Sequence, residues 1–120
     1  MKKKNLPIQD AAEKLCLYTL GITQNLNNFP KKYRHTLVDR ILNITFDIAD
    51  HIDSANILFG EDRLYYITLA LGDCRKNKRY IRMVYEKLHP ECSIPYWDSL
   101  VTDVEEQLLK WQKYVRGQLR

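Results

Sequence analysis

The chain has 120 residues, of which 45% are hydrophobic and 28% charged, with only four glycines and four prolines. That length can enclose one hydrophobic core, and so few helix breakers favour a small number of long elements. The net charge of +4 weakly favours an anionic partner. The three cysteines fit no metal-ligand spacing, so we expect reduced thiols and a cytoplasmic location.

The start of the chain is basic, but no apolar stretch of the signal-peptide kind follows it. No apolar run approaches the ~20 residues that a membrane-spanning helix needs. We therefore expect residues 1–7 to form a basic tail, and no contact of the chain with a membrane.

The first helix is predicted over about 8–28. Its apolar residues recur at steps of four and three, as Ala11, Leu15, Tyr18, Ile22 and Leu26. This spacing places them on one face of a helix. The pair Phe29-Pro30 marks the break that follows, because the residue before a proline is disfavoured in the helical conformation.

The most regular pattern comes next, in residues 29–56, where the stripe is Leu37, Ile41, Ile44, Ile48 and Ile52. A strand would distribute these side chains over two faces, whereas a helix keeps them on one. A second helix is therefore predicted over about 30–56, with Pro30 in its first turn, where a missing N–H is no loss. Residues 30–34 could form a separate turn at its start. A helix with a single apolar stripe needs other helices to cover it.

Two more helices are predicted, over about 61–88 and 95–118, separated by a loop at 89–95. The third carries a heptad seam that includes one lysine, formed by Leu64, Ile67, Leu71, Cys74, Lys78, Ile81, Tyr85 and Leu88. The stripe of the fourth consists of Trp97, Leu100, Val101, Val104, Leu108, Trp111 and Val115.

Four helices with short connections and no strand pattern predict an all-α fold. The expected architecture is an antiparallel up-down-up-down four-helix bundle, formed by residues 8–120 as a single domain.

The third predicted helix carries the most distinctive surface feature. Six basic residues fall within 75–87, opposed there only by Glu86: Arg75, Lys76, Lys78, Arg79, Arg82 and Lys87. At about 100° per residue, four of them share an arc of roughly 100°: Arg75, Lys78, Arg79 and Arg82. Such an arc can bind phosphates without reading bases. The alternative is a solvated face whose charges are balanced by the aspartates of the second helix.

A second basic group, Lys31, Lys32 and Arg34, follows the first helix and is a further candidate for nucleic-acid binding. Tyr80 and Tyr85 lie close to the basic stretch of the third helix and could stack on a base. Tyrosines at the edge of a bundle are more often packing residues, however.

Metal binding and catalysis have little support. Asp47, Asp50 and His51 resemble half of a helical metal site, but no helix supplies the matching Glu-x-x-His pair. Cys16 and Cys74 lie on apolar faces and are expected in the core. We expect no metal, no cofactor and no catalytic residue.

Two sets of large side chains leave alternatives open. Trp97 and Trp111 either fill the core or include one that lies at a subunit interface, where tryptophan is enriched. Tyr65 and Leu69 point away from the seam of the third helix. Exposed on an isolated bundle, they would favour self-association.

The segment Phe29–Ile41, FPKKYRHTLVDRI, resembles the FP-[KR]-x-x-R-[FH]-T-L-x-[DE]-R-I signature. That signature belongs to the accessory variability determinant (Avd) proteins of diversity-generating retroelements. They are part of a wider family of small four-helix-bundle proteins that includes those encoded in ribosomal RNA intervening sequences. The leucine-rich and basic third helix, and Glu106–Trp111 near the end, are also similar to this family, so the resemblance covers about 8–116.

The resemblance implies a homopentamer of four-helix bundles with a positively charged surface. It also implies a non-catalytic accessory protein that binds a reverse transcriptase and its nucleic acid, RNA or DNA, in mutagenic reverse transcription. The basic positions that it carries over are Arg75, Arg79 and Arg82, with Arg34 and Arg40 from the signature. Arg40 could instead be structural, paired with Asp39 or another carboxylate. The alternative function is a protein-interaction scaffold of the intervening-sequence type that binds no nucleic acid.

Overall fold

A computed structural model of the protein describes residues 5–119. Four long helices account for most of this range: α1 (Pro7–Gln24), α2 (Asp39–Ile57), α3 (Gly60–Leu88) and α4 (Ile94–Gln118). No strand occurs between residues 5 and 119, so the predicted all-α fold with four helices is confirmed. The lysines of the predicted tail, Lys2, Lys3 and Lys4, lie outside the described residues.

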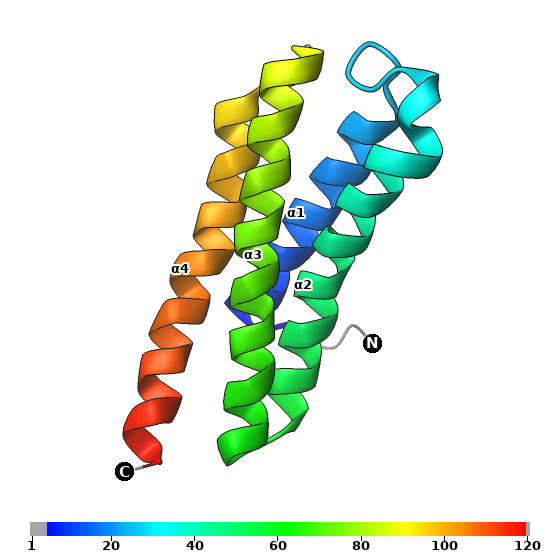
Figure 1. Ribbon diagram of the computed structural model, residues 1–120. Helices are drawn as coiled ribbons and strands as arrows, with labels where there is room; N and C mark the ends of the chain where they lie inside the picture. The colour runs from blue at the N-terminus through cyan, green and yellow to red at the C-terminus, as the bar shows by residue number, and fades with distance from the viewer. Residues whose placement is uncertain (1–4, 120) are drawn as a thin grey trace.

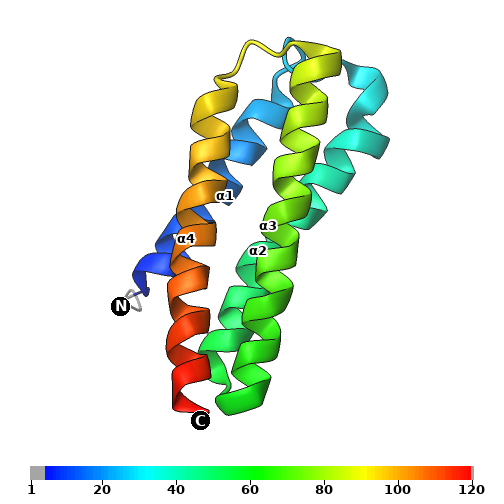
Figure 2. The same ribbon diagram turned by 60° about the vertical axis from the view of Figure 1, so that its left-hand side comes forward.

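The four helices lie side by side (Figures 1 and 2). α1 packs against α2 and α4, and α3 packs against the same two helices from the other side. Only Leu58 and Phe59 separate α2 from α3. In Figure 1 the chain rises along α1 and α3 and descends along α2 and α4.

The first helix ends at Gln24, four residues before the predicted boundary at 28. The cause is a run of asparagines whose side chains compete for backbone hydrogen bonds. Asn28 is buried, and its Nδ2 donates to the carbonyl oxygen of Ile22 at 3.1 Å. Its Oδ1 accepts from the backbone N–H of Cys92 at 3.0 Å, so this side chain joins the end of α1 to the loop before α4.

The second predicted helix, over about 30–56, is not regular at its start, and a separate first turn is present, as the sequence allowed. The segment begins with a 3₁₀ turn, η1 (Lys31–Tyr33), and a π turn, η2 (Arg34–Val38), before α2. A π turn holds one residue more than an α-helical turn. The residues within it therefore face the core at different positions from those that an α-helix would place there. Just before α2 the buried residue is therefore Val38 rather than Leu37. Within α2 the predicted Ile41, Ile48 and Ile52 are buried together with Thr45, while Ile44 is half-buried.

Among the described residues, Trp97 near the start of α4 is the largest fully buried side chain. Its Nε1 donates to Thr19 Oγ1 of α1 at 3.2 Å, and its ring meets Phe29 edge to face with centroids 6.4 Å apart. Phe29, the first residue of the FP signature, therefore fixes the chain against α4 just before η1.

The seam of α3 is wider than predicted. Ile67, Leu71, Cys74 and Ile81 are buried as expected, but Lys78 is half-buried and Tyr85 is exposed. The remaining buried positions are Ala70, Asp73, Asn77 and Val84. The reason is that α3 contacts both α2 and α4, so two adjoining stripes face the interior.

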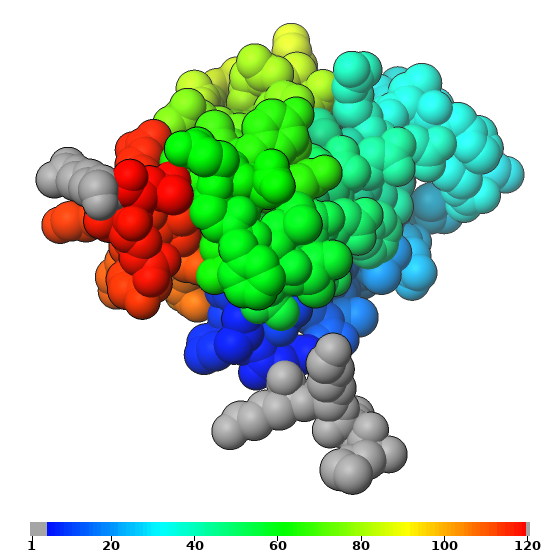
Figure 3. Space-filling view, turned by 90° about the horizontal axis from the view of Figure 1, so that it is seen from below, coloured from blue at the N-terminus to red at the C-terminus, as the bar shows by residue number. Residues whose placement is uncertain are grey.

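The connection between α2 and α3 lies beside the end of α4 (Figure 3). Gly60 has a φ of 59°, a left-handed conformation that costs glycine little. Arg63 Nε donates to the carbonyl oxygen of Ala55 at 2.9 Å and its Nη2 to that of Asn56 at 3.1 Å. Its guanidinium also lies over the rings of Phe59 and Trp111. Among the described residues, no helix has the length and apolar character required to cross a membrane.

Candidate nucleic-acid interface

Four basic side chains form an exposed strip along the outer side of α3, which we call the basic ridge: Arg75, Lys76, Arg79 and Arg82. The ridge faces outward because Cys74, Asn77 and Ile81 point into the bundle. From Arg75 to Arg82 the helix rises roughly 10 Å, at about 1.5 Å per residue. Within residues 5–119, no ion pair involves any of the four.

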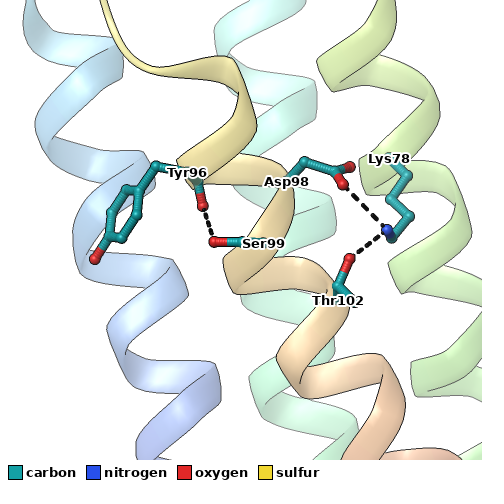
Figure 4. Close-up of polar contacts among 5 residues, drawn as sticks. All are labelled: Lys78, Tyr96, Asp98, Ser99 and Thr102. Atoms are coloured by element: carbon teal, nitrogen blue, oxygen red, sulfur yellow. Dashed lines mark hydrogen bonds and ion pairs between the residues drawn. The ribbon is translucent and has the colours of Figure 1, made fainter.

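Lys78 behaves differently from its basic neighbours, although the sequence placed it in the same arc. It is half-buried, and its Nζ lies 3.4 Å from Asp98 Oδ2 and donates to Thr102 Oγ1 at 2.5 Å (Figure 4). Both partners belong to α4, so the ammonium group joins two helices of its own chain. We expect Lys78 to contribute less to phosphate binding than the arginines beside it.

The second predicted basic group lies on η1 and η2, with Lys31, Lys32 and Arg34 all exposed. Lys31 and Arg34 border a small cavity shared with α1 and α2, whereas Arg82 borders a cavity between α3 and α4. The two basic groups therefore border different cavities.

Pairing of the ridge with the aspartates of α2 was the alternative interpretation. In the part of the chain that the structure describes, Asp39 lies 3.8 Å from His35, and Asp53 accepts from Gln9 at 3.0 Å. No ion pair in this part joins α2 to a ridge residue. Within residues 5–119, the ridge arginines are thus open to an external anion.

Polar side chains of α2 and α3 contact one another where the two helices pack. His51 Nδ1 lies 2.5 Å from Asp73 Oδ2, and Asn77 Nδ2 donates to Thr45 Oγ1 at 2.9 Å. Burial raises the pKa of the Asp73 carboxyl, while the hydrogen bond with His51 opposes that rise. No group of three or more potential metal ligands occurs over residues 5–119.

A groove of about 930 Å³ separates the start of α2 from the end of α3. Its apolar lining includes Leu37, Ile44, Met83 and Leu88, and Arg40 and Lys87 are among its polar residues. Arg40, a signature residue, is exposed there. The sequence did not predict this groove, which lies where the 3₁₀ and π turns lead into α2.

The two tryptophans of α4, and Tyr65 and Leu69 of α3, lie in different environments. Trp97 is a core residue of its own chain, and Trp111 is half-buried beside Arg63. Tyr65 is exposed as expected and meets Tyr66 edge to face, whereas Leu69 is half-buried.

Comparison of the chain with protein-family models, curated proteins and solved structures yields no match. The features that bear on function are consequently the basic ridge, the groove and the signature segment at 29–41. Of these, the ridge has the most specific chemistry, since arginines on one helix face with no ion-pair partner in residues 5–119 suit phosphate groups.

Proposed function

We propose that this protein is a cytoplasmic, non-catalytic accessory factor of a diversity-generating retroelement. In this proposal the chain is an antiparallel up-down-up-down bundle that binds RNA or DNA through the basic ridge and assists a reverse transcriptase. The observation that carries the proposal is the exposure of Arg75, Arg79 and Arg82 on one helix face without an ion-pair partner in residues 5–119. The resemblance of segment 29–41 to Avd proteins supports it.

The ridge would bind the sugar-phosphate backbone. Three guanidinium groups along roughly 10 Å of helix can each neutralise a phosphate and release its counterions. Such contacts position a nucleic acid without specifying its sequence. Binding should therefore weaken steeply as the salt concentration rises.

Assembly would strengthen this interaction. In the homopentamer that the resemblance implies, five copies of the ridge would engage one strand or duplex together. Linked weak sites gain apparent affinity because later contacts form at a high effective concentration. The reverse transcriptase would then meet template and accessory protein as one complex.

The test compares two variants of equal charge. The ridge variant carries Arg75→Gln, Arg79→Gln and Arg82→Gln, and the control carries Lys110→Gln, Lys113→Gln and Arg116→Gln on the exposed side of α4. Losing three phosphate contacts should reduce the log–log salt slope on single strands by about 2. Between 50 and 200 mM salt, the wild type should therefore lose about 20-fold more affinity than the ridge variant.

The measurement is fluorescence anisotropy with labelled RNA and DNA, and light scattering gives the subunit number. The control should keep the wild-type salt slope. Equal slopes for the ridge variant and the wild type would reject the ridge as the binding surface.

A protein-interaction scaffold is the second candidate, and the groove beside the π turn favours it. Met83 is almost half exposed there, next to half-buried Leu37 and Ile44. An unpartnered apolar groove of this size suits a partner protein. This function predicts no salt-dependent binding of RNA or DNA by the wild type.

A further inference from the structure

A cavity of about 300 Å³ lies beside the basic ridge, between α3 and the first turns of α4. Its walls are two isoleucines, one tyrosine and three charged residues: Lys78, Ile81, Arg82, Tyr85, Ile94 and Asp98. The volume is at the lower end of the range for small-ligand sites, which suits one flat group. Figure 4 shows the helices on either side, with Lys78 reaching across to Asp98.

Tyr85 is the aromatic residue of this cavity. Its side chain is 55% exposed, and its ring meets His89 edge to face with centroids 6.2 Å apart. Tyr80, the other tyrosine near the ridge, packs against the core. The fold therefore uses Tyr80 as a packing residue and leaves much of the Tyr85 ring open to solvent.

Arg82 connects the cavity to the ridge. It lines the cavity, and it is also the last arginine of the ridge. Around the helix axis, Tyr85 lies about 60° from Arg82, on the side that faces α4. A phosphate on Arg82 would thus place its attached nucleotide beside an aromatic ring with an apolar floor.

We propose that this cavity is a base-stacking subsite and that the protein consequently prefers single-stranded nucleic acid to duplex. The proposal rests on the proposed function, since the ridge must first bind the backbone. An unpaired base can turn into the cavity and stack on Tyr85, while the bases of a duplex are held inside it. Stacking of this kind tolerates any base, because every base has a π face.

The experiment measures the affinity of the full chain for three labelled probes at one low salt concentration. They are a thymidine oligonucleotide, an abasic oligonucleotide with the same number of phosphates, and a duplex of the same length. The wild type should bind the oligonucleotide with bases at least about fivefold more tightly than the abasic one. Binding to the duplex should also be weaker than binding to the thymidine strand.

Three variants assign the effect to Tyr85. Tyr85→Leu should lose the preference for bases and bind the abasic probe like the wild type, whereas Tyr85→Trp should keep the preference. The matched control is Tyr65→Leu, because Tyr65 lies on the same helix and is 59% exposed. It should behave like the wild type.

The outcomes separate this proposal from the one it rests on. Equal, ridge-dependent affinity for the abasic and thymidine strands would overturn the stacking subsite and leave phosphate binding in place. A base preference that survives in Tyr85→Leu would overturn the assignment to this cavity. Absence of binding to all three probes would overturn both proposals.

Discussion

Replacement of Trp97 with alanine tests the packing of the start of α4 against α1 and Phe29. The side chain is 0% exposed, contacts Phe29 and donates a hydrogen bond to Thr19. Truncating a buried aromatic residue of this size costs about 3–5 kcal/mol, because the cavity left behind collapses only in part. Small domains have unfolding free energies of about 5–15 kcal/mol, so the loss would be a large fraction of the total.

The same figures give an expected change in melting temperature. The unfolding entropy is about 2.1 cal/mol/K per residue, or roughly 0.25 kcal/mol/K for a chain of this length. A loss of about 4 kcal/mol therefore lowers the melting temperature by about 16 °C. Trp97→Phe retains much of the apolar volume and should cost less than Trp97→Ala.

The assay is urea unfolding followed by far-UV circular dichroism, with Trp111→Ala as the control. Trp111 lies on the same helix but is only half-buried, so its truncation should cost clearly less. In Trp111→Phe the remaining tryptophan reports on the core alone, and its fluorescence should shift to the red on unfolding. A smaller cost for Trp97→Ala than for Trp111→Ala would refute the central role of Trp97.

Two other predictions concern the α3–α4 contact and the thiols. The double variant Lys78→Met, Asp98→Asn keeps the net charge, and it should lower the unfolding free energy by about 0.5–1 kcal/mol without changing the salt slope of nucleic-acid binding. A reduced slope would show that Lys78 binds phosphate. Burial raises the pKa of Cys16 to about 11 and that of Cys74 to about 12. Because the thiolate is the reactive form, an aromatic disulfide reagent at pH 8 should rapidly label only half-buried Cys92, and faster as the pH rises. Cys92→Ser should abolish this rapid phase, and rapid labelling of three thiols would contradict the buried positions.

The periodicity of the apolar residues was sufficient to predict four helices, because each helix buries a stripe that local spacing records. The phase of α3 likewise explains why Arg75, Arg79 and Arg82 face outward. Local spacing could not indicate that α3 has two buried stripes, since that depends on its position between α2 and α4. It also could not reveal that Lys78 meets Asp98, twenty residues away on α4.

The start of the second helix shows a different limit. Leu37 fits an uninterrupted α-helical stripe with Ile41, yet the π turn at 34–38 buries Val38 in its place. Phe29 and Asn28 are anchored by residues 97 and 92, far along the chain. Such long-range constraints decide how the chain enters α2, and no window of local sequence contains them. The groove that results was therefore missed.

The side-chain amide of Asn28 has a mechanical consequence for the bundle. Its oxygen accepts from the backbone N–H of Cys92 in the loop before α4, and its nitrogen donates to the carbonyl oxygen of Ile22 in α1. Residues 64 positions apart in the chain are thus joined. This bond can form only after α3 has returned the chain to the end where α1 stops, which Figure 2 shows at the top. One side chain thereby links the segment after α1 with the loop before α4, so a change of conformation at Cys92 would act on residue 28, which precedes η1.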